Sequence, residues 1–319
     1  MSTIFNKTKD RKDSGKTRNG ESQAVRRNSL PDEDTAPEKP KKILITGANS
    51  YIGESVRDYL TAASDMYSVG IKDTIGWTPA PEDLKGYDTV FNVAGIAHGK
   101  ETDVNRHLYY EVNRDLVINI ARAAKEARVP QMIMLSSMSV YGLTEGYITK
   151  DTEPNPVNAY GLSKLEADIA VSQLRSNDFR IAILRPPMVY GPGCRGNYQT
   201  LRSFALKSPV FPDYSNMRSM VYIDNLSEFV KRVIDREEDG LFFPQNEKYV
   251  CTKDMVSLIA QIHGHRIKET PLFNPALKLT GLRFDIIRKV FGNLTYEKVD
   301  CVSKTDFTDS IYRSEGLGR

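Results

Sequence analysis

Tyr160 and Lys164 are the pair of residues whose types and spacing point most directly to chemistry. They lie four positions apart in a stretch whose pattern predicts a helix, so both side chains would occupy one face. A free phenol has a pKa of about 10, and a neighbouring ammonium group favours the phenolate. We therefore expect Lys164 to lower the pKa of Tyr160 toward the range useful for general acid and base catalysis. A surface Tyr–Lys pair without a role is the alternative interpretation.

Ser137 adds a hydroxyl group at the end of a predicted strand. Residues 131–135 form a short apolar run, typical of a buried strand, and Ser136 and Ser137 follow it directly. Proteins that alternate strands and helices place their sites at the carboxyl ends of the strands. We expect the Ser137 hydroxyl to donate a hydrogen bond to a substrate oxygen and so to orient proton transfer by Tyr160.

A glycine-containing turn after residues 42–47 is the second candidate site. Those residues form an apolar, β-branched run that predicts a buried strand, and a helical pattern follows the turn. The amino end of a helix presents free N–H groups that suit a pyrophosphate, although an ordinary strand-to-helix turn has the same pattern. Position 50 is Ser where the usual spacing has glycine, and serine resists positive φ. The predicted phosphate-binding residues are Gly47, Asn49, Ser50, Tyr51, Ile52 and Gly53.

The residues that follow the second predicted strand, 67–71, indicate which dinucleotide this turn would bind. An acidic side chain there binds the adenosine ribose of NAD, whereas a basic one accommodates the additional phosphate of NADP. The sequence offers both, Lys72 and Asp73. We expect NAD, bound through Asp73, and leave NADP as the alternative.

The elements that must position these groups alternate between strand and helix patterns. Such alternation predicts an α/β fold, a Rossmann-type doubly wound parallel sheet with helices on both faces. The sequence after Pro186 is richer in Pro, Gly and aromatic residues, which predicts a smaller C-terminal substrate-binding domain. Strand patterns occupy 42–47, 67–71, 88–95, 131–135 and 180–184, and helix patterns occupy 56–60, 109–127, 158–174, 253–263 and 284–291.

Three parts are predicted along the chain. Residues 1–40 are polar and charged and have too little apolar surface to offset the entropy of ordering, so we expect a disordered basic tail. Residues 41–186 would form the dinucleotide-binding Rossmann domain, and residues 187–319 the substrate-binding domain. The segment 220–235 is expected to return to the Rossmann domain.

Charge and cysteine content exclude several classes of protein. The net charge of +3 comes from residues 1–42, which hold 11 basic and 7 acidic side chains, and the remainder is close to neutral. Nucleic-acid binding needs clustered positive charge on a folded surface, so we expect none. The three cysteines lack metal or disulfide spacing, which predicts free thiols, no metal site and a reducing cytoplasm. No apolar run approaches the roughly 20 residues of a membrane helix, so no membrane association is expected.

Seven motifs occur in a fixed order between residue 42 and about residue 300. They are TGANSYIG (46–53), NVAG (92–95), EVNRDL (111–116), LSSMSVYG (135–142), YGLSK (160–164), LRPPMVYGPG (184–193) and RSMVYIDNL (218–226). With them the chain resembles extended short-chain dehydrogenases/reductases of the NAD-dependent epimerase/dehydratase family. It is most similar there to nucleotide-sugar 4-epimerases, such as UDP-glucose 4-epimerases, and to 4-keto-sugar reductases of bacterial surface-polysaccharide pathways.

The resemblance implies catalytic roles for four residues. Ser137 would lie beside the sugar C4 oxygen, and Tyr160 would be the acid and base. Lys164 would assist Tyr160 and hold the nicotinamide ribose, and Asn113 would support the active site from a helix.

The resemblance also implies binding partners. Ala94 lies in a motif beside the cofactor, and Arg218 and Asn197 match groups that contact a diphosphate, which a fork of donors suits. The implied ligands are NAD and a nucleotide sugar, which we expect to be UDP-linked. The family commonly pairs through two long helices, so a homodimer is expected.

Two departures narrow the choice of reaction. Met138 and Ser139 stand where dehydratases carry Asp-Glu, so elimination is not expected, and Met188 replaces an asparagine of many epimerases. Our hypothesis is hydride chemistry at the sugar C4 by an epimerase that retains NAD. An NAD(P)H-dependent 4-keto-sugar reductase would use the same residues. A non-catalytic dinucleotide-binding regulator and a basic tail that docks to acidic proteins or to a membrane surface are the alternatives from other classes.

Overall fold

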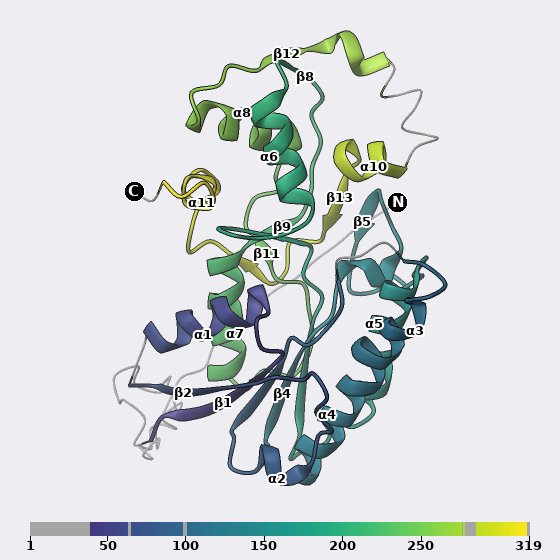
Figure 1. Ribbon diagram of the computed structural model, residues 1–319, viewed down its shortest axis with the longest axis vertical. Helices are drawn as coiled ribbons and strands as arrows, with labels where there is room; N and C mark the ends of the chain where they lie inside the picture. Colours follow the sequence, from purple (N-terminus) through teal and green to yellow (C-terminus); the bar gives the residue numbers. More distant parts are fainter. Residues whose placement is uncertain (1–38, 63–64, 98–100, 276, 278–284, 318–319) are drawn as a thin grey trace, which may run out of the picture. The chain divides into compact units, whose positions relative to one another are not determined.

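One parallel sheet forms the centre of the protein, and its strands come from the short apolar runs of the sequence (Figure 1). The strand order is β10-β6-β4-β3-β1-β2, and every pairing is parallel. The chain runs from β1 to β2 on one side and then crosses to β3 on the other, so the predicted doubly wound α/β fold is confirmed. The strands are β1 (Lys41–Thr46), β2 (Tyr67–Lys72), β3 (Thr89–Asn92), β4 (Gln131–Leu135), β6 (Arg180–Leu184) and β10 (Gly240–Phe242).

The computed structural model describes residues 39–62, 65–97, 101–275, 277 and 285–317. All of them lie in one compact unit, Pro37–Arg319. The predicted disordered tail, residues 1–40, falls outside the described residues except for its last two.

Both faces of the sheet are buried. Ile43 and Ile45 of β1 pack into one hydrophobic core, and Leu44 between them packs into another. Successive side chains of a strand point to opposite faces, so this alternation places one core on each side of the sheet. Complete burial of such a side chain contributes roughly 1.5–3 kcal/mol to stability.

Helices form the two outer layers. α1 and α7 pack against each other over the core that contains Ile43 and Ile45, and α4 and α5 cover the core that contains Leu44. The helices are α1 (Tyr51–Ala62), α2 (Pro81–Leu84), α3 (Arg106–Tyr110), α4 (Leu116–Glu126), α5 (Ala159–Ser172), α6 (Asn197–Lys207), α7 (Ile223–Asp235), α8 (Thr252–Ile262), α10 (Asp285–Phe291) and α11 (Phe307–Ser314).

The helix predicted over 109–127 contains a wide turn. α3 passes into a π-helical turn, Glu111–Asp115, and then into α4 without leaving helical backbone angles. A π-helical turn inserts one residue and locally rotates the side chains, and such turns are frequent at functional sites.

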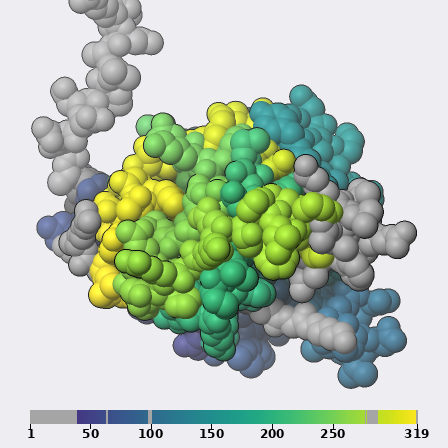
Figure 2. Space-filling model, turned by 90° about the horizontal axis from the view of Figure 1, so that it is seen from above, coloured from purple at the N-terminus to yellow at the C-terminus, as the bar shows by residue number. Residues whose placement is uncertain are grey.

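Smaller elements of the second half lie at the carboxyl ends of the central strands (Figure 1). Figure 2 shows this end, where the green and yellow segments of the C-terminal half cover most of the face. β10 is a strand of the central sheet and α7 belongs to a helical layer beside it, and the boundary at residue 186 stays a prediction. The paired short strands are β5 (Gly146–Ile148) with β13 (Leu294–Tyr296), β7 (Met188–Tyr190) with β9 (Met220–Tyr222), β8 (Val210–Pro212) with β12 (Lys268–Thr270), and β11 (Gln245–Asn246) with β14 (Cys301–Val302).

Three further observations bear on the expected classes of ligand. None of the described helices is long and apolar enough to cross a membrane. Cys194, Cys251 and Cys301 are free thiols. Within the described ranges, no three His, Cys, Asp or Glu side chains are grouped as a metal site.

Candidate active site

The turn after β1 lies at the point where the strand order reverses. Gly47 has φ of +110°, and a Cβ atom there would lie 2.8 Å from the backbone nitrogen of Ala94. Only glycine fits this close approach, which brings the ends of β1 and β3 together. A crevice at this place in an open α/β sheet is the usual site of a dinucleotide.

The structure resolves the question raised by serine at position 50. Besides Gly47, the residue with positive φ in this turn is Asn49, at 60°, and asparagine tolerates the left-handed region. Ser50 Oγ accepts a hydrogen bond from Gly53 N at 3.4 Å and so caps the first turn of α1. Gly53 itself packs closely, because a Cβ there would lie 2.9 Å from Val93 Cγ2. The helix therefore begins at the turn without a third glycine.

Two polar groups beside the turn are buried and lack a hydrogen-bond partner among the described residues. They are the Tyr51 hydroxyl and the Asn92 Nδ2 group. Thr46 Oγ1 donates to Asn92 Oδ1 at 2.8 Å, so the free amide group is held in place between β1 and β3. Buried polar groups without partners need an explanation, and a polar ligand in this cradle would provide one. The turn, the close approach at Gly47 and these two groups fit a bound dinucleotide.

Asn113 connects the π-helical turn to the loop after β3. It is fully buried, its Oδ1 accepts from Ile96 N at 2.8 Å, and its Nδ2 donates to Ile96 O at 3.1 Å. A Cβ at Gly95 would lie 3.0 Å from Asn113 Oδ1 and 3.1 Å from Lys164 Nζ. Asn113, Gly95 and Lys164 therefore meet at one place beside the crevice.

Lys164 is buried in the second turn of α5. Its Nζ donates to Leu135 O, the last carbonyl of β4, at 2.9 Å. Burial lowers the pKa of Lys164 to about 8, because desolvation disfavours the ammonium form, and the negative charge of Asp168 opposes this shift. The side chain is therefore mostly protonated at pH 7.

Tyr160 and Ser137 lie together at the end of β4. Burial raises the pKa of the Tyr160 phenol, and a hydrogen bond with Ser137 partly opposes the increase. The expectation that Lys164 lowers the pKa of Tyr160 is wrong for this structure. Desolvation of the phenolate is the larger effect, and Lys164 directs its ammonium group to Leu135 O.

A buried charged network lies behind these residues, and our sequence analysis missed it. Asp168, one helical turn beyond Lys164, accepts from Ser136 Oγ at 2.8 Å and from Arg185 Nε at 2.9 Å. Arg185 also donates to the Tyr141 hydroxyl at 2.8 Å. An aspartate on the same face of a helix as Lys164, together with an arginine directly after a buried strand, was the available signal.

The predicted diphosphate-binding residues lie on other elements. Arg218 Nη1 donates to Gly292 O at 2.9 Å, and burial lowers its pKa despite the negative charge of Glu145. A guanidinium group that is this desolvated suits an anionic ligand. Asn197 is exposed at the first residue of α6. No recorded contact joins either residue to Tyr160 within the described part of the chain.

Asp73 is exposed at the end of β2, where it was predicted to bind a ribose. Its Oδ1 accepts from Ile75 N at 3.0 Å, which fixes a tight turn. The neighbouring Lys72 places its ammonium group 5.1 Å from the Trp77 ring centre and 3.9 Å from Asp83. Asp73 therefore has fewer side-chain contacts than Lys72.

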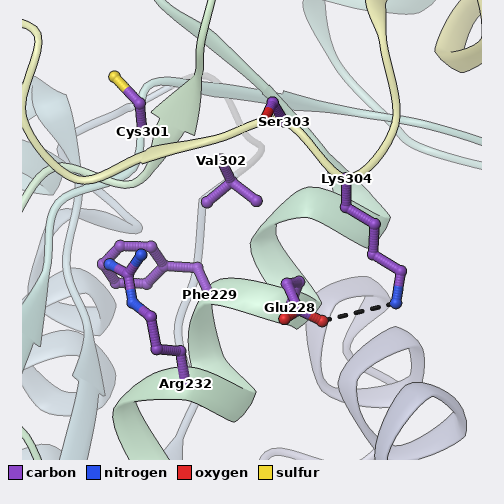
Figure 3. A pocket seen from close by; sticks show the side chains of 7 residues that line it. All are labelled: Glu228, Phe229, Arg232, Cys301, Val302, Ser303 and Lys304. Atoms are coloured by element: carbon purple, nitrogen blue, oxygen red, sulfur yellow. Dashed lines mark hydrogen bonds and ion pairs between the residues drawn. The ribbon is translucent and has the colours of Figure 1, made fainter.

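A hollow of about 510 Å³ lies between α7 and the segment 301–304, and none of the predicted site residues lines it (Figure 3). Its two cations already have acidic neighbours: Lys304 Nζ is 3.5 Å from Glu228, and Arg232 Nε is 3.9 Å from Glu238. We do not include this hollow in the candidate active site.

The fold and the Ser137–Tyr160–Lys164 group together define an extended short-chain dehydrogenase/reductase. Residues 43–251 match the model of the NAD dependent epimerase/dehydratase family, and the chain belongs to this family. The UDP-glucose 4-epimerase of Vibrio cholerae is a relative of this chain, with 30% identity over 287 residues. That alignment covers 80% of this chain and 87% of the relative.

Two further similarities agree with this assignment. An N-acetyl-α-D-glucosaminyl-diphospho-ditrans,octacis-undecaprenol 4-epimerase of Escherichia coli O157:H7 is 26% identical over 272 residues, 78% of this chain and 81% of that protein. The structure of a Bacillus cereus UDP-glucuronic acid 4-epimerase in complex with NAD superimposes with a TM-score of 0.67 at 19% identity. It covers 86% of this chain and 98% of that one, which supports the shared fold.

Proposed function

We propose that this enzyme inverts the configuration at C4 of a sugar that is linked through a diphosphate, with UDP-glucose-type nucleotide sugars as the expected substrates. One observation carries the proposal: Ser137, Tyr160 and Lys164 meet at the end of β4, near the turn after β1 whose geometry fits a dinucleotide. The relatives from V. cholerae and E. coli support the C4 position, since both are named as 4-epimerases.

Tyr160, Ser137 and Lys164 would have different roles in the reaction. Tyr160 would take the proton from the C4 hydroxyl when that carbon is oxidised and return a proton when it is reduced. Ser137, which hydrogen-bonds Tyr160, would bind the same substrate oxygen. Lys164 would hold the nicotinamide ribose through its ammonium group, and Asn113 would hold the loop beside it.

The crevice residues would hold NAD, which when bound accepts and returns a hydride at the sugar carbon. The N–H groups at the start of α1 would bind its pyrophosphate, and the close approach at Gly47 and Ala94 would let it reach the backbone. Asp73 would bind the adenosine ribose. The residues assigned to this role are Gly47, Asn49, Ser50, Tyr51, Ile52, Gly53, Asp73, Ala94 and Lys164.

Arg218 and Asn197 would contact the diphosphate of the substrate. The diphosphate is the part shared by UDP-glucose and by the lipid-linked sugar in the name of the E. coli relative. The desolvated guanidinium of Arg218 supports this role, because a charge-assisted bond to an anion is strong where water is excluded.

Release of the retained dinucleotide tests the proposal. The purified protein is denatured, and the liberated cofactor is measured by absorbance and mass. About one NAD per chain is the expected result, because an epimerase regenerates its cofactor in each cycle. A protein that binds only exchangeable NAD(P)H would instead be a 4-keto-sugar reductase, the second candidate. A non-catalytic regulator is disfavoured because it needs no Ser137–Tyr160–Lys164 group.

We also infer a homodimer in the cytoplasm. Leu162 and Ile169 lie on one face of α5 with 37% and 53% of their surfaces exposed, as a helix that pairs with a second copy would require. The three free thiols support a reducing compartment.

A further inference from the structure

Asp168 is a carboxylate in the interior of the protein, with only 2% of its surface exposed. Burying an ion costs several kcal/mol unless hydrogen bonds and a counter-charge compensate for the lost water. Ser136 and Arg185 supply these at Oδ2, whereas Oδ1 is buried and has no hydrogen-bond partner among the described residues. Burial raises the pKa of Asp168, and Arg185, Ser136 and Lys164 oppose this increase because they favour the carboxylate form.

The two hydrogen-bond partners of Asp168 follow two different strands. Ser136 follows the last residue of β4, and Arg185 follows the last residue of β6. Arg185 reaches Tyr141 in the short helix after β4, and its carbonyl accepts from the Tyr296 hydroxyl at 2.9 Å. One carboxylate thus ties α5 to the carboxyl ends of two neighbouring strands.

The same strand end carries the residues of the proposed chemistry. Ser136 precedes Ser137, and Leu135 O receives the ammonium group of Lys164. Lys164 lies one turn before Asp168 on α5. A shift of α5 along β4 would therefore break the Asp168 contacts and the Lys164 contact together.

We propose that Asp168 is a positioning residue of the reaction, which fixes the ammonium group of Lys164 against the end of β4. This inference rests on the role given to Lys164 under the proposed function. Asp168 touches neither substrate nor cofactor in this proposal and acts through Lys164 alone.

The other ionisable groups around Lys164 do not replace Asp168. On α5 itself these are Tyr160 and, on the outer face, Glu166, whose charge is matched by Arg114 from the π-helical turn at 2.8 Å. The Tyr109 ring of α3 lies edge-on to Tyr160 at 6.4 Å. Asp168 is the charged group that acts on the Lys164 pKa and raises it against desolvation.

The test is a pH titration of Lys164 in the full-length protein. The signal of lysine labelled with ¹³C at the ε position is monitored by NMR at each pH. Lys164→Arg identifies the signal. Asp168→Asn should move the midpoint downward by about one pH unit, because the favourable charge is removed. The turnover number at pH 9 should then fall about tenfold with an unchanged KM, since the ammonium form is depleted there.

Three variants separate positioning from general stability. Asp168→Glu keeps the charge and should restore the wild-type midpoint. Thr89→Val removes a buried 2.9 Å hydrogen bond to Gln131 at the opposite end of β3 and β4, and it should lower the melting temperature without moving the midpoint. If Asp168→Asn does not fold, Asp168→Asn with Arg185→Gln removes both buried charges and should show a smaller downward shift, because loss of the Arg185 charge acts in the opposite direction.

An unchanged midpoint in Asp168→Asn, or in the double variant if the single one does not fold, would overturn the inference. The NMR titration needs no substrate. It therefore decides the role of Asp168 even if the protein proves not to be an epimerase, which the cofactor and product measurements decide separately.

Discussion

Tyr160 and Lys164 occupy successive turns of one helix, and burial disfavours the charged form of both. The phenol therefore holds its proton to higher pH, while the ammonium group loses its proton at lower pH. At neutral pH the pair consists of a neutral phenol and a charged lysine. A neutral Tyr160 can donate a proton when the sugar carbon is reduced, and it must first ionise to accept the C4 hydroxyl proton when that carbon is oxidised.

Replacing the phenol tests its role directly. Tyr160→Phe should lower the turnover number by at least about 100-fold, the range of a lost general acid and base, while the melting temperature stays within a few degrees. Turnover of the diphosphate sugar and thermal unfolding measure the two effects. Tyr109→Phe, which alters the phenol in contact with Tyr160, is the matched control and should retain activity. Full turnover in Tyr160→Phe would remove Tyr160 from the mechanism.

The pH dependence of activity should report Lys164. Its pKa of about 8 means that the ammonium form is present below pH 8 and is lost as the pH rises, so activity should decline on that side. Arginine stays protonated over the whole accessible range. In Lys164→Arg the alkaline decline should therefore move above pH 10, at a lower maximal rate. A decline that remains near pH 8 in the variant would assign it to another group.

Single residues show where sequence reasoning succeeds and where it cannot. The spacing of Tyr160 and Lys164 was sufficient to place them on one helix face. The direction of the Tyr160 pKa shift was wrong, because it depends on desolvation by residues distant in sequence. Asp168 and Arg185 were missed for the same reason, since only the folded chain brings them together.

The residues of the candidate site follow the carboxyl ends of parallel strands. β1, β3 and β4 end at the same edge of the sheet, and their last residues carry the turn, the Gly95 loop and Ser137. The π-helical turn brings Asn113 to that edge. Strand ends and one wide turn therefore account for the geometry of the site.

The turn after β1 gives a prediction at this scale. Gly47→Ala forces a left-handed backbone on alanine and puts its Cβ 2.8 Å from Ala94 N, which should cost about 1–3 kcal/mol of stability. We expect most of the retained dinucleotide to be lost. Gly76→Ala, at φ of +68° with nothing within 4 Å of the added Cβ, is the matched control and should keep the cofactor. Equal retention in both variants would show that the close approach is unimportant.

Segments with a strong hydrophobic pattern were predicted correctly, whereas segments with a weak pattern were not. The strands at 131–135 and 180–184 have the predicted bounds, because their mostly apolar runs are largely buried in the sheet. The bounds of β10 were not predicted, because its three residues carry little pattern and pair with β6 only in the folded chain. The wide turn at 111–115 was missed because one inserted residue hardly alters helical periodicity.

The whole molecule is expected to act as a pair. Ile169→Arg on the exposed face of α5 should shift the protein from dimer to monomer, because an apolar contact between copies would be replaced by two like charges. Light scattering after size-exclusion chromatography measures the mass. Phe204→Arg, at a residue 50% exposed on α6, is the matched control and should leave the dimer intact. A wild-type monomer would contradict the inferred dimer.

The fold as a whole supports several reactions, so the site and its product must decide among them. The most direct measurement is proton NMR of UDP-glucose incubated with the purified protein and no added cofactor. We predict the appearance of the C4-inverted nucleotide sugar, and its absence with Tyr160→Phe. If neither UDP-glucose nor UDP-N-acetylglucosamine is inverted, yet a 4-keto nucleotide sugar is reduced when NAD(P)H is supplied, the epimerase proposal is contradicted.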